Sequence, residues 1–210
     1  NMIGWGVTSL ITDGRGLSDI TQGITLEVFG EGNSMGPLSP VMKTEFPKYW
    51  AGINPQWTTL GEYLERLEAK GVAPNIASFI GATTPRIHVL GQDDVDPTPQ
   101  QLKLMQELVR EAMREGAVGV ASSLIYTPAS FAETDELVAL AKAAAEYGGI
   151  YASHLRNEGK QIFDALDELI TISREAAIPA EIYHLKIAHP PSWDRFDDVL
   201  ARIEAARSEG

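Results

Sequence analysis

The feature that most constrains the fold of this chain is a regular alternation of short apolar segments with amphipathic ones. Five segments have the apolar, β-branched composition of buried strands: 24–30, 75–80, 117–123, 150–154 and 180–184. Helical periodicity separates them, most clearly in 59–70 and 98–115. Strict alternation of this kind predicts an α/β fold with a parallel sheet and right-handed crossovers.

A doubly wound sheet and a (β/α)8 barrel both fit this order. The segments that follow the strands are long, and no glycine-rich phosphate-binding motif follows the first strand, which favours the barrel. A complete barrel has eight strand–helix units in about 250 residues. The 210 residues supply five or six, so we expect a partial TIM barrel, about strands 2–6 with their helices. Residues 1–210 would then be the central part of a single barrel domain.

Local signals predict where helices begin and which segments are loops. Thr98 and Thr134 precede apolar periodic segments and are expected to be helix N-caps. The segments 42–58 and 81–97 show little periodicity, and we expect both to be loops.

Composition excludes several classes of function. Seventeen Lys and Arg against 29 Asp and Glu give a formal charge of −12, which argues against nucleic acid or an anionic membrane as the main partner. The chain has no cysteine, so disulfides and thiolate metal ligands are excluded. No apolar run approaches the roughly 20 residues of a membrane span, and no signal peptide is visible at the start. We expect a cytoplasmic protein, of which this chain is a fragment.

Two of the four histidines end consecutive predicted strands. His154 and His184 each follow a short apolar run, and the C-terminal ends of barrel strands are where barrel enzymes place their chemistry. Neighbouring strands lie roughly 5 Å apart, so one ion can bridge both imidazoles. Glu31, at the end of the first clear strand, is the candidate third ligand. From spacing alone, metal-free acid–base residues or buried core histidines remain equally open.

Other polar residues near these strand ends are candidates for substrate contact. Arg156 and Lys186 follow their histidines by two and are expected on the same side, where they could hold an anionic group or pair with nearby acids such as Glu158. Tyr126 could donate its phenol to a developing oxyanion, or pack as an aromatic lid contact.

Three further residues have no expected part in the site. His88 and His189 lie in predicted loops and are expected at the surface. Glu27 stands in the middle of a predicted buried strand, which is costly for an unpaired carboxylate. We therefore expect Glu27 to affect folding.

Four motifs in this order, QGITLEVFGEGNSMGP, GVASSLIYTPASFAETDEL, YASHLRNEG and YHLKIAHP, resemble the N-acyl-D-amino-acid deacylases (D-aminoacylases) of the amidohydrolase superfamily. The resemblance implies a zinc-dependent barrel hydrolase in which His154 and His184 are the ligands from strands five and six. Glu31 would replace the family's cysteine ligand. Lys186 would help hold the substrate carboxylate, with Tyr126 and Arg156 lining the same pocket.

The chain departs from the family pattern in one place, and a second family element lies outside it. The family's first strand carries His-x-His, whereas the corresponding residues here are Asn1 to Gly4, so one Zn²⁺ is expected and a second site is expected to be weakened or lost. The family's general-base aspartate is expected beyond Gly210. No catalytic residue is therefore assigned within the chain, and the fragment alone is expected to be inactive.

The resulting expectation is a hydrolase that cleaves the amide bond of N-acyl-D-amino acids or related dipeptides, so the partner would be a small molecule. One alternative is a degenerate amidohydrolase barrel that binds a ligand or partner without turnover. A second is a metal-free lyase or isomerase that uses the two histidines as acid and base.

Overall fold

The computed structural model describes residues 1–50 and 52–209. The strands are β1 (Leu26–Phe29), β2 (Asn75–Ser78), β3 (Ile80–Gly81), β4 (Gly119–Ser123), β5 (Ile150–His154) and β6 (Ala180–Ile182). The helices are α1 (Ser9–Thr12), α2 (Leu17–Ile20), α3 (Pro40–Tyr49), α4 (Leu60–Lys70), α5 (Thr83–Leu90), α6 (Pro99–Arg114), α7 (Thr134–Ala145), α8 (Ile162–Ala176) and α9 (Phe196–Glu209), with 3-10 turns η1 (Ala129–Phe131) and η2 (Pro190–Arg195).

All strand pairs are parallel and follow one another in chain order. β1 pairs with β2, and β3, β4, β5 and β6 form a second ladder. Only Phe79 separates β2 from β3, and its backbone N–H donates to the carbonyl of Phe29, so the two ladders form one curved layer. Every strand therefore ends at the same edge, which is the edge that carries the candidate ligands.

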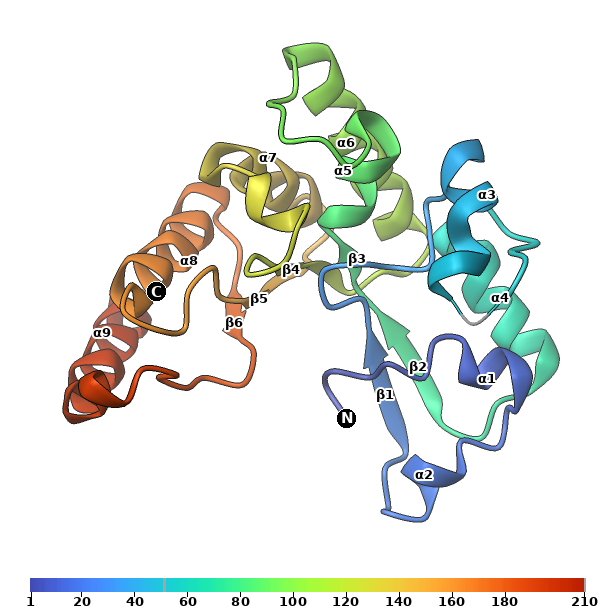
Figure 1. Cartoon of the computed structure of the whole chain (residues 1–210), viewed down its shortest axis with the longest axis horizontal. Helices are drawn as coiled ribbons and strands as arrows, with labels where there is room; N and C mark the ends of the chain where they lie inside the picture. The colour runs from blue at the N-terminus through green and yellow to red at the C-terminus, as the bar shows by residue number, and fades with distance from the viewer. Residues whose placement is uncertain (51, 210) are drawn as a thin grey trace.

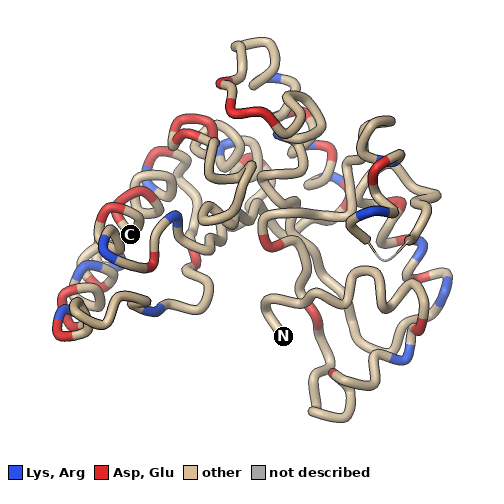
Figure 2. The backbone as a smooth tube through the Cα atoms, viewed as in Figure 1, with Lys and Arg blue, Asp and Glu red and all other residues tan. Residues whose placement is uncertain are grey.

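The strands follow an arc and the helices cover its convex side (Figure 1). Most charged residues lie on these outer helices and their loops (Figure 2). The six strands carry only Glu27 and Glu181 as charged residues. A large apolar core lies between the strands and the helices, and a smaller cluster fills the concave side, formed by Val28, Phe79, Ala121, Ala152 and Tyr183. Two-sided burial of this kind is typical of parallel sheets. No helix in the described part of the chain is long and apolar enough to cross a membrane.

The N-terminal segment lies along the free edge of β1. Val28 donates to the carbonyl of Asn1 and accepts from the N–H of Gly4, whereas the N–H groups of Asn75 and Phe79 donate to the carbonyls of Thr25 and Phe29 on the other edge. Because alternate residues of a strand direct their hydrogen bonds to opposite edges, Asn1 to Gly4 occupy the place of a preceding strand. That place carries no histidine.

The structure confirms the α/β class, the parallel order and all five predicted strands. The helices 59–70 and 98–115 are also confirmed, since Thr59 and Thr98 each form a capping box with the residue three positions later. Thr134 was wrongly expected to be an N-cap: Glu133 is the N-cap of α7, and the Thr134 hydroxyl donates to Glu168 instead.

The two predicted loops each contain a helix. In 42–58 the structure has most of α3, which begins at Pro40 behind an N-cap bond from the Met42 N–H to Ser39. Pro47 inside α3 and a weak apolar period hid this helix from sequence reasoning. In 81–97 the structure has α5, whose N–H at Thr83 donates to the carbonyl of Gly32. A tertiary contact thus anchors the start of α5.

Glu27 is buried within β1 beneath the N-terminal segment. Its carboxylate lies so close to Gly4 and Gly6 that a Cβ at either glycine would come within 2.9 Å of Oε2. The other oxygen, Oε1, has no hydrogen-bond partner. Burial, and next the charge of Asp19, raise the pKa of the Glu27 carboxyl above its ordinary value of 4.5. Since the folded state binds this proton more tightly than the unfolded state, Glu27 stabilises the fold less as pH rises.

We therefore expect Glu27→Gln to stabilise the protein at neutral and alkaline pH. Below about pH 4 the free energies of unfolding of variant and wild type should coincide, and near pH 8 the variant should be favoured by about 1 kcal/mol, as expected for a buried carboxylate lacking a partner. Chemical denaturation across this range measures the difference. Glu181→Gln, at an exposed glutamate of β6, controls for the loss of one charge. A Glu27→Gln variant less stable at every pH would contradict this account.

Candidate metal centre

Glu31 is carried into the site by a turn between two glycines. Gly30 has φ +98° and Gly32 has φ +73°, both in the left-handed region that favours glycine. A Cβ at Gly30 would lie 2.3 Å from the carbonyl oxygen of Phe79, and one at Gly32 would lie 2.7 Å from Cβ of Ser123. This close packing holds the Glu31 backbone against the ends of β3 and β4.

The two histidines reach the same place from the ends of neighbouring strands. His154 is the last residue of β5, in register with Ser123 of β4. His184 lies two residues beyond β6 and has φ +36°, an uncommon conformation for a residue other than glycine. Their rings are 4.4 Å apart at 87°. Left-handed backbone at a non-glycine residue is costly and often marks a functional site.

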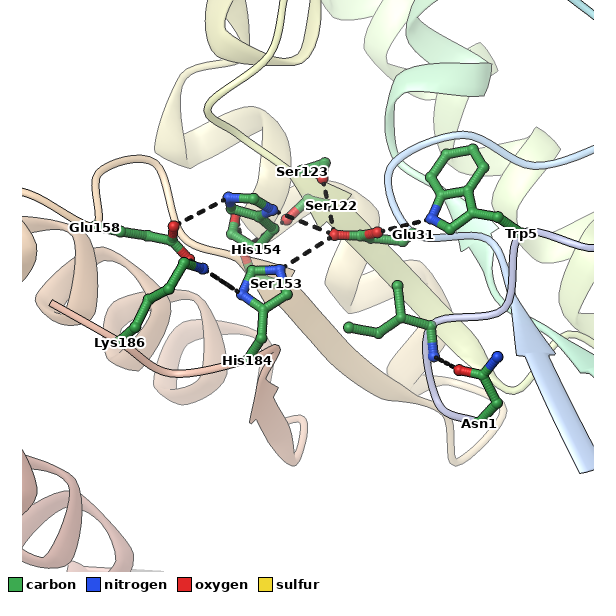
Figure 3. A network of polar contacts seen from close by, with 11 residues as sticks. Asn1, Trp5, Glu31, Ser122, Ser123, Ser153, His154, Glu158, His184 and Lys186 are labelled. Carbon is green, nitrogen blue, oxygen red and sulfur yellow. Dashed lines mark hydrogen bonds and ion pairs between the residues drawn. The ribbon is translucent and has the colours of Figure 1, made fainter. Parts of the chain in front are cut away.

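One carboxylate oxygen faces both imidazoles (Figure 3). Oε1 of Glu31 lies 3.3 Å from Nδ1 of His154 and 3.6 Å from Nε2 of His184. The three ligand atoms lie within 4.8 Å of one another. Among the described residues these three side chains are the group able to hold a metal ion.

The remaining contacts of Glu31 fix its carboxylate in this orientation. Trp5 donates from Nε1 to Oε2 at 3.2 Å, and Ser123 donates from its hydroxyl to Oε1 at 3.3 Å. Glu31 is 8% exposed and His154 is 7% exposed. One carboxylate and two neutral imidazoles form the donor set of many catalytic zinc sites, which leave a position open for water or substrate. The residues present therefore fit a single divalent ion.

A cavity of about 440 Å³ opens onto these groups. Its size is within the range of small-molecule sites. The lining residues come from the N-terminal segment and from the loops after β1, β3, β4, β5 and β6: Trp5, Glu31, Asn33, Thr83, Ser123, Tyr126, Thr127, Ala129, His154 and His184. Trp5, which sequence reasoning missed, has an exposed ring that stacks on Trp50 with ring centroids 6.1 Å apart.

Glu158 is the second residue of the site that sequence reasoning missed. It is 6% exposed, and its carboxylate lies 2.5 Å from Nζ of Lys186 and 3.1 Å from Nδ1 of His184. It also lies 3.6 Å from Nε2 of His154. Its position four residues after His154, in HLRNE, was visible, but Glu158 was considered only as a partner for a nearby cation.

Arg156 does not line the cavity, and its guanidinium bonds to other residues of the chain. Its guanidinium donates to both carboxylate oxygens of Glu168 and to the carbonyls of Ser130 and Ala132. The hydrogen bonds to Glu168 raise the pKa of Arg156. The expectation that Arg156 points to the same side as His154 was wrong. Strand β5 ends at His154, so the alternation of a strand does not extend to Arg156. We assign Arg156 to positioning the loop that carries Tyr126.

Lys186 lies beside the histidine pair but outside the lining of the cavity. Its Nζ contacts Glu158 and lies 2.9 Å from Nδ1 of His184. Tyr126 does line the cavity, with its ring 5.4 Å from that of His154. Burial, and next the charge of Glu31, raise the pKa of the neighbouring Tyr183 phenol. The substrate contacts of Lys186 and Tyr126 stay predictions.

His88 and His189 lie outside the centre. His88 is on α5, with Nδ1 3.3 Å from the carbonyl of Pro37, and His189 contacts the hydroxyl of Ser192. Both are partly exposed, which is consistent with the expected surface positions, but His88 lies on a helix and not in a loop as expected.

Parallel strands in chain order, with a carboxylate and two imidazoles at their C-terminal ends, define a segment of a β/α barrel with a candidate metal centre. Comparison with known proteins shows what the chain is similar to. A D-aminoacylase of Alcaligenes xylosoxydans xylosoxydans is 34% identical over 189 residues, which are 89% of this chain and 39% of that protein. No family model matches the chain.

Solved structures agree. A crystal structure of D-aminoacylase, described as defining a novel subset of amidohydrolases, superposes with a TM-score of 0.84 at 31% identity, covering 97% of this chain and 43% of that one. An N-acyl-D-glutamate deacylase from Bordetella bronchiseptica, complexed with zinc and a phosphonate inhibitor, superposes with a TM-score of 0.81 at 27% identity, covering 96% and 43%. The chain is similar over nearly its whole length to N-acyl-D-amino-acid deacylases of the amidohydrolase type, and it spans about two fifths of the length of these relatives.

Glu31→Ala should abolish tight zinc binding in the complete protein, because it removes the one carboxylate that faces both imidazoles. We expect a loss of at least 100-fold in affinity, beyond the 10- to 100-fold typical of residues that only support a ligand. Competition with a chromophoric chelator measures the affinity, and Glu181→Ala is the control. Full zinc content in Glu31→Ala would exclude Glu31 as a ligand.

Arg156→Met should destabilise the fold, because it leaves the buried end of Glu168 and two loop carbonyls without donors. A cost of about 1–3 kcal/mol in the free energy of unfolding is expected from these lost hydrogen bonds. Arg110→Met is the matched control, since Arg110 pairs with the exposed Glu146 and surface pairs contribute about 0–1 kcal/mol. Equal effects of the two substitutions, measured by urea denaturation, would contradict the positioning role of Arg156.

Proposed function

We propose that the complete protein is a metal-dependent hydrolase that cleaves the amide bond of N-acyl-D-amino acids. The observation that carries the proposal is the donor set of Glu31, His154 and His184 at the floor of a cavity large enough for a small molecule. The family relationship supports the reaction and the class of substrate. Side-chain preference is left open, since relatives named for different substrates match the chain equally well along its length.

Glu31, His154 and His184 would hold one ion, and we propose Zn²⁺. When bound, such an ion supplies Lewis-acid polarisation of the amide carbonyl and lowers the pKa of a coordinated water. Trp5 and Ser123 keep the Glu31 carboxylate directed at the imidazoles, so the donor set is formed before any ligand enters. The N-terminal segment contributes no histidine, which supports one ion over two.

Two residues of the chain are proposed to orient the substrate. Tyr126 lines the cavity with an exposed phenol, which could donate a hydrogen bond to the developing oxyanion. Lys186 has a half-exposed side chain beside the ion site and could attract the substrate carboxylate. A general base is proposed to come from elsewhere in the complete protein, because the described acids near the cavity, Glu31 and Glu158, are both engaged with imidazoles.

Zinc content and stereospecific hydrolysis test this function together. We expect the complete protein to bind one zinc per chain, to lose activity on chelation and to recover it when zinc is added. Amine release from N-acetyl-D-amino acids with apolar, acidic and basic side chains should exceed release from their L enantiomers. Zinc well below one per chain would favour a degenerate barrel, and activity insensitive to chelation would favour metal-free acid–base chemistry.

A further inference from the structure

Glu158 sits on the opposite side of the imidazole pair from Glu31 (Figure 3). Its Oε1 is 3.1 Å from Nδ1 of His184 and its Oε2 is 3.6 Å from Nε2 of His154. Glu31 faces the other nitrogen of each ring. The two imidazoles therefore lie between two buried carboxylates, and each carboxylate faces one nitrogen of each ring.

We propose that Glu158 is a positioning residue that selects the metal-binding tautomer of both histidines at once. An imidazole can bind a cation only through a nitrogen that carries no proton, and its other N–H usually donates to a carboxylate or carbonyl. When an ion occupies the space beside Glu31, His154 would present Nδ1 and His184 would present Nε2 to it, with the Nε2–H of His154 and the Nδ1–H of His184 directed at Glu158. In the structure, Nδ1 of His154 lies within hydrogen-bonding distance of Oε1 of Glu31, and Nε2 of His154 has no hydrogen-bond partner. One side chain would thus orient two ligands from two different strands.

The structure around Glu158 holds its carboxylate in place. Its backbone carbonyl accepts from the N–H of Ala188, which ties the loop after β5 to the loop after β6. The preceding side chain, Asn157, accepts from the N–H groups of Gly159 and Gln161. A buried carboxylate is costly unless a positive charge or hydrogen bonds compensate it. Lys186 supplies the nearest positive charge, at 2.5 Å.

Lys186 could favour the other tautomer of His184. Its Nζ lies 2.9 Å from Nδ1 of His184 and could donate to that nitrogen, which would place the ring proton on Nε2, toward Glu31. In the proposed arrangement both Nζ and the Nδ1–H of His184 donate to the same oxygen, Oε1 of Glu158. The two arrangements assign the ring proton of His184 to different nitrogens and can be distinguished directly.

The test is Glu158→Gln in the complete protein, with Glu181→Gln as the control for an exposed glutamate on the adjoining strand. An amide of the same shape can accept from only one of the two N–H groups and turns its own N–H₂ toward the other ring. Zinc affinity should fall about 10- to 100-fold, the range for residues that orient a ligand. In the zinc-loaded wild type, ¹⁵N NMR of the imidazoles should show the ring proton of His154 on Nε2 and that of His184 on Nδ1, and the variant should lose that pattern as it loses zinc.

Two results would overturn the proposal: zinc affinity within twofold of wild type in folded Glu158→Gln, or ring protons on the nitrogens that face Glu31 in the zinc-loaded wild type. If circular dichroism shows that Glu158→Gln is unfolded, Glu158→Asp keeps the charge at shorter reach and should lower zinc affinity in the same direction. The inference rests on the metal site of the proposed function, but the experiments can contradict one without contradicting the other. A wild type that binds zinc without hydrolysing N-acyl-D-amino acids contradicts the proposed reaction and leaves the role of Glu158 standing.

Discussion

The candidate site depends on one contact between segments far apart in the chain: a single oxygen of Glu31 faces the imidazoles of both His154 and His184. The parallel sheet makes this possible, because it brings the ends of β1, β5 and β6 to one edge. The glycines on either side of Glu31 let the backbone pack against β3 and β4 at the cost of conformational freedom. Without that turn, the carboxylate would stay in line with Glu27 and Phe29 of β1.

Sequence reasoning reached the elements whose signals are local. Short apolar runs located the strands, and helical periodicity, with an N-cap at Thr98, located two helices. Helix α3 was missed because of Pro47 and its weak apolar period, and α5 was missed because its start depends on a tertiary contact. The α5 helix begins on the loop that carries Glu31, through the bond from Thr83 to Gly32, and no local pattern encodes that contact.

The residues of the site also separate into those that sequence reasoning found and those that it missed. The three proposed ligands were found because the sequence places each at the end of a predicted strand. In the structure His154 is the last residue of β5, and Glu31 and His184 each lie two residues beyond their strands. Glu158 and Arg156 lie beyond the end of β5, where strand alternation no longer sets the direction of a side chain. Arg156 therefore turns to Glu168 and Glu158 to the imidazoles, although they follow His154 by only two and four residues. Trp5 was missed because its bond to Glu31 spans segments that sequence spacing cannot relate.

Anomalous diffraction at the zinc edge, from crystals of the complete protein grown with zinc, tests the central claim most directly. The account predicts one peak bonded to an oxygen of Glu31, Nδ1 of His154 and Nε2 of His184, each at about 2.0–2.2 Å, with Glu158 on the far side of both rings. A peak on the Glu158 side of the imidazoles, or an ion that does not contact Glu31, would contradict it.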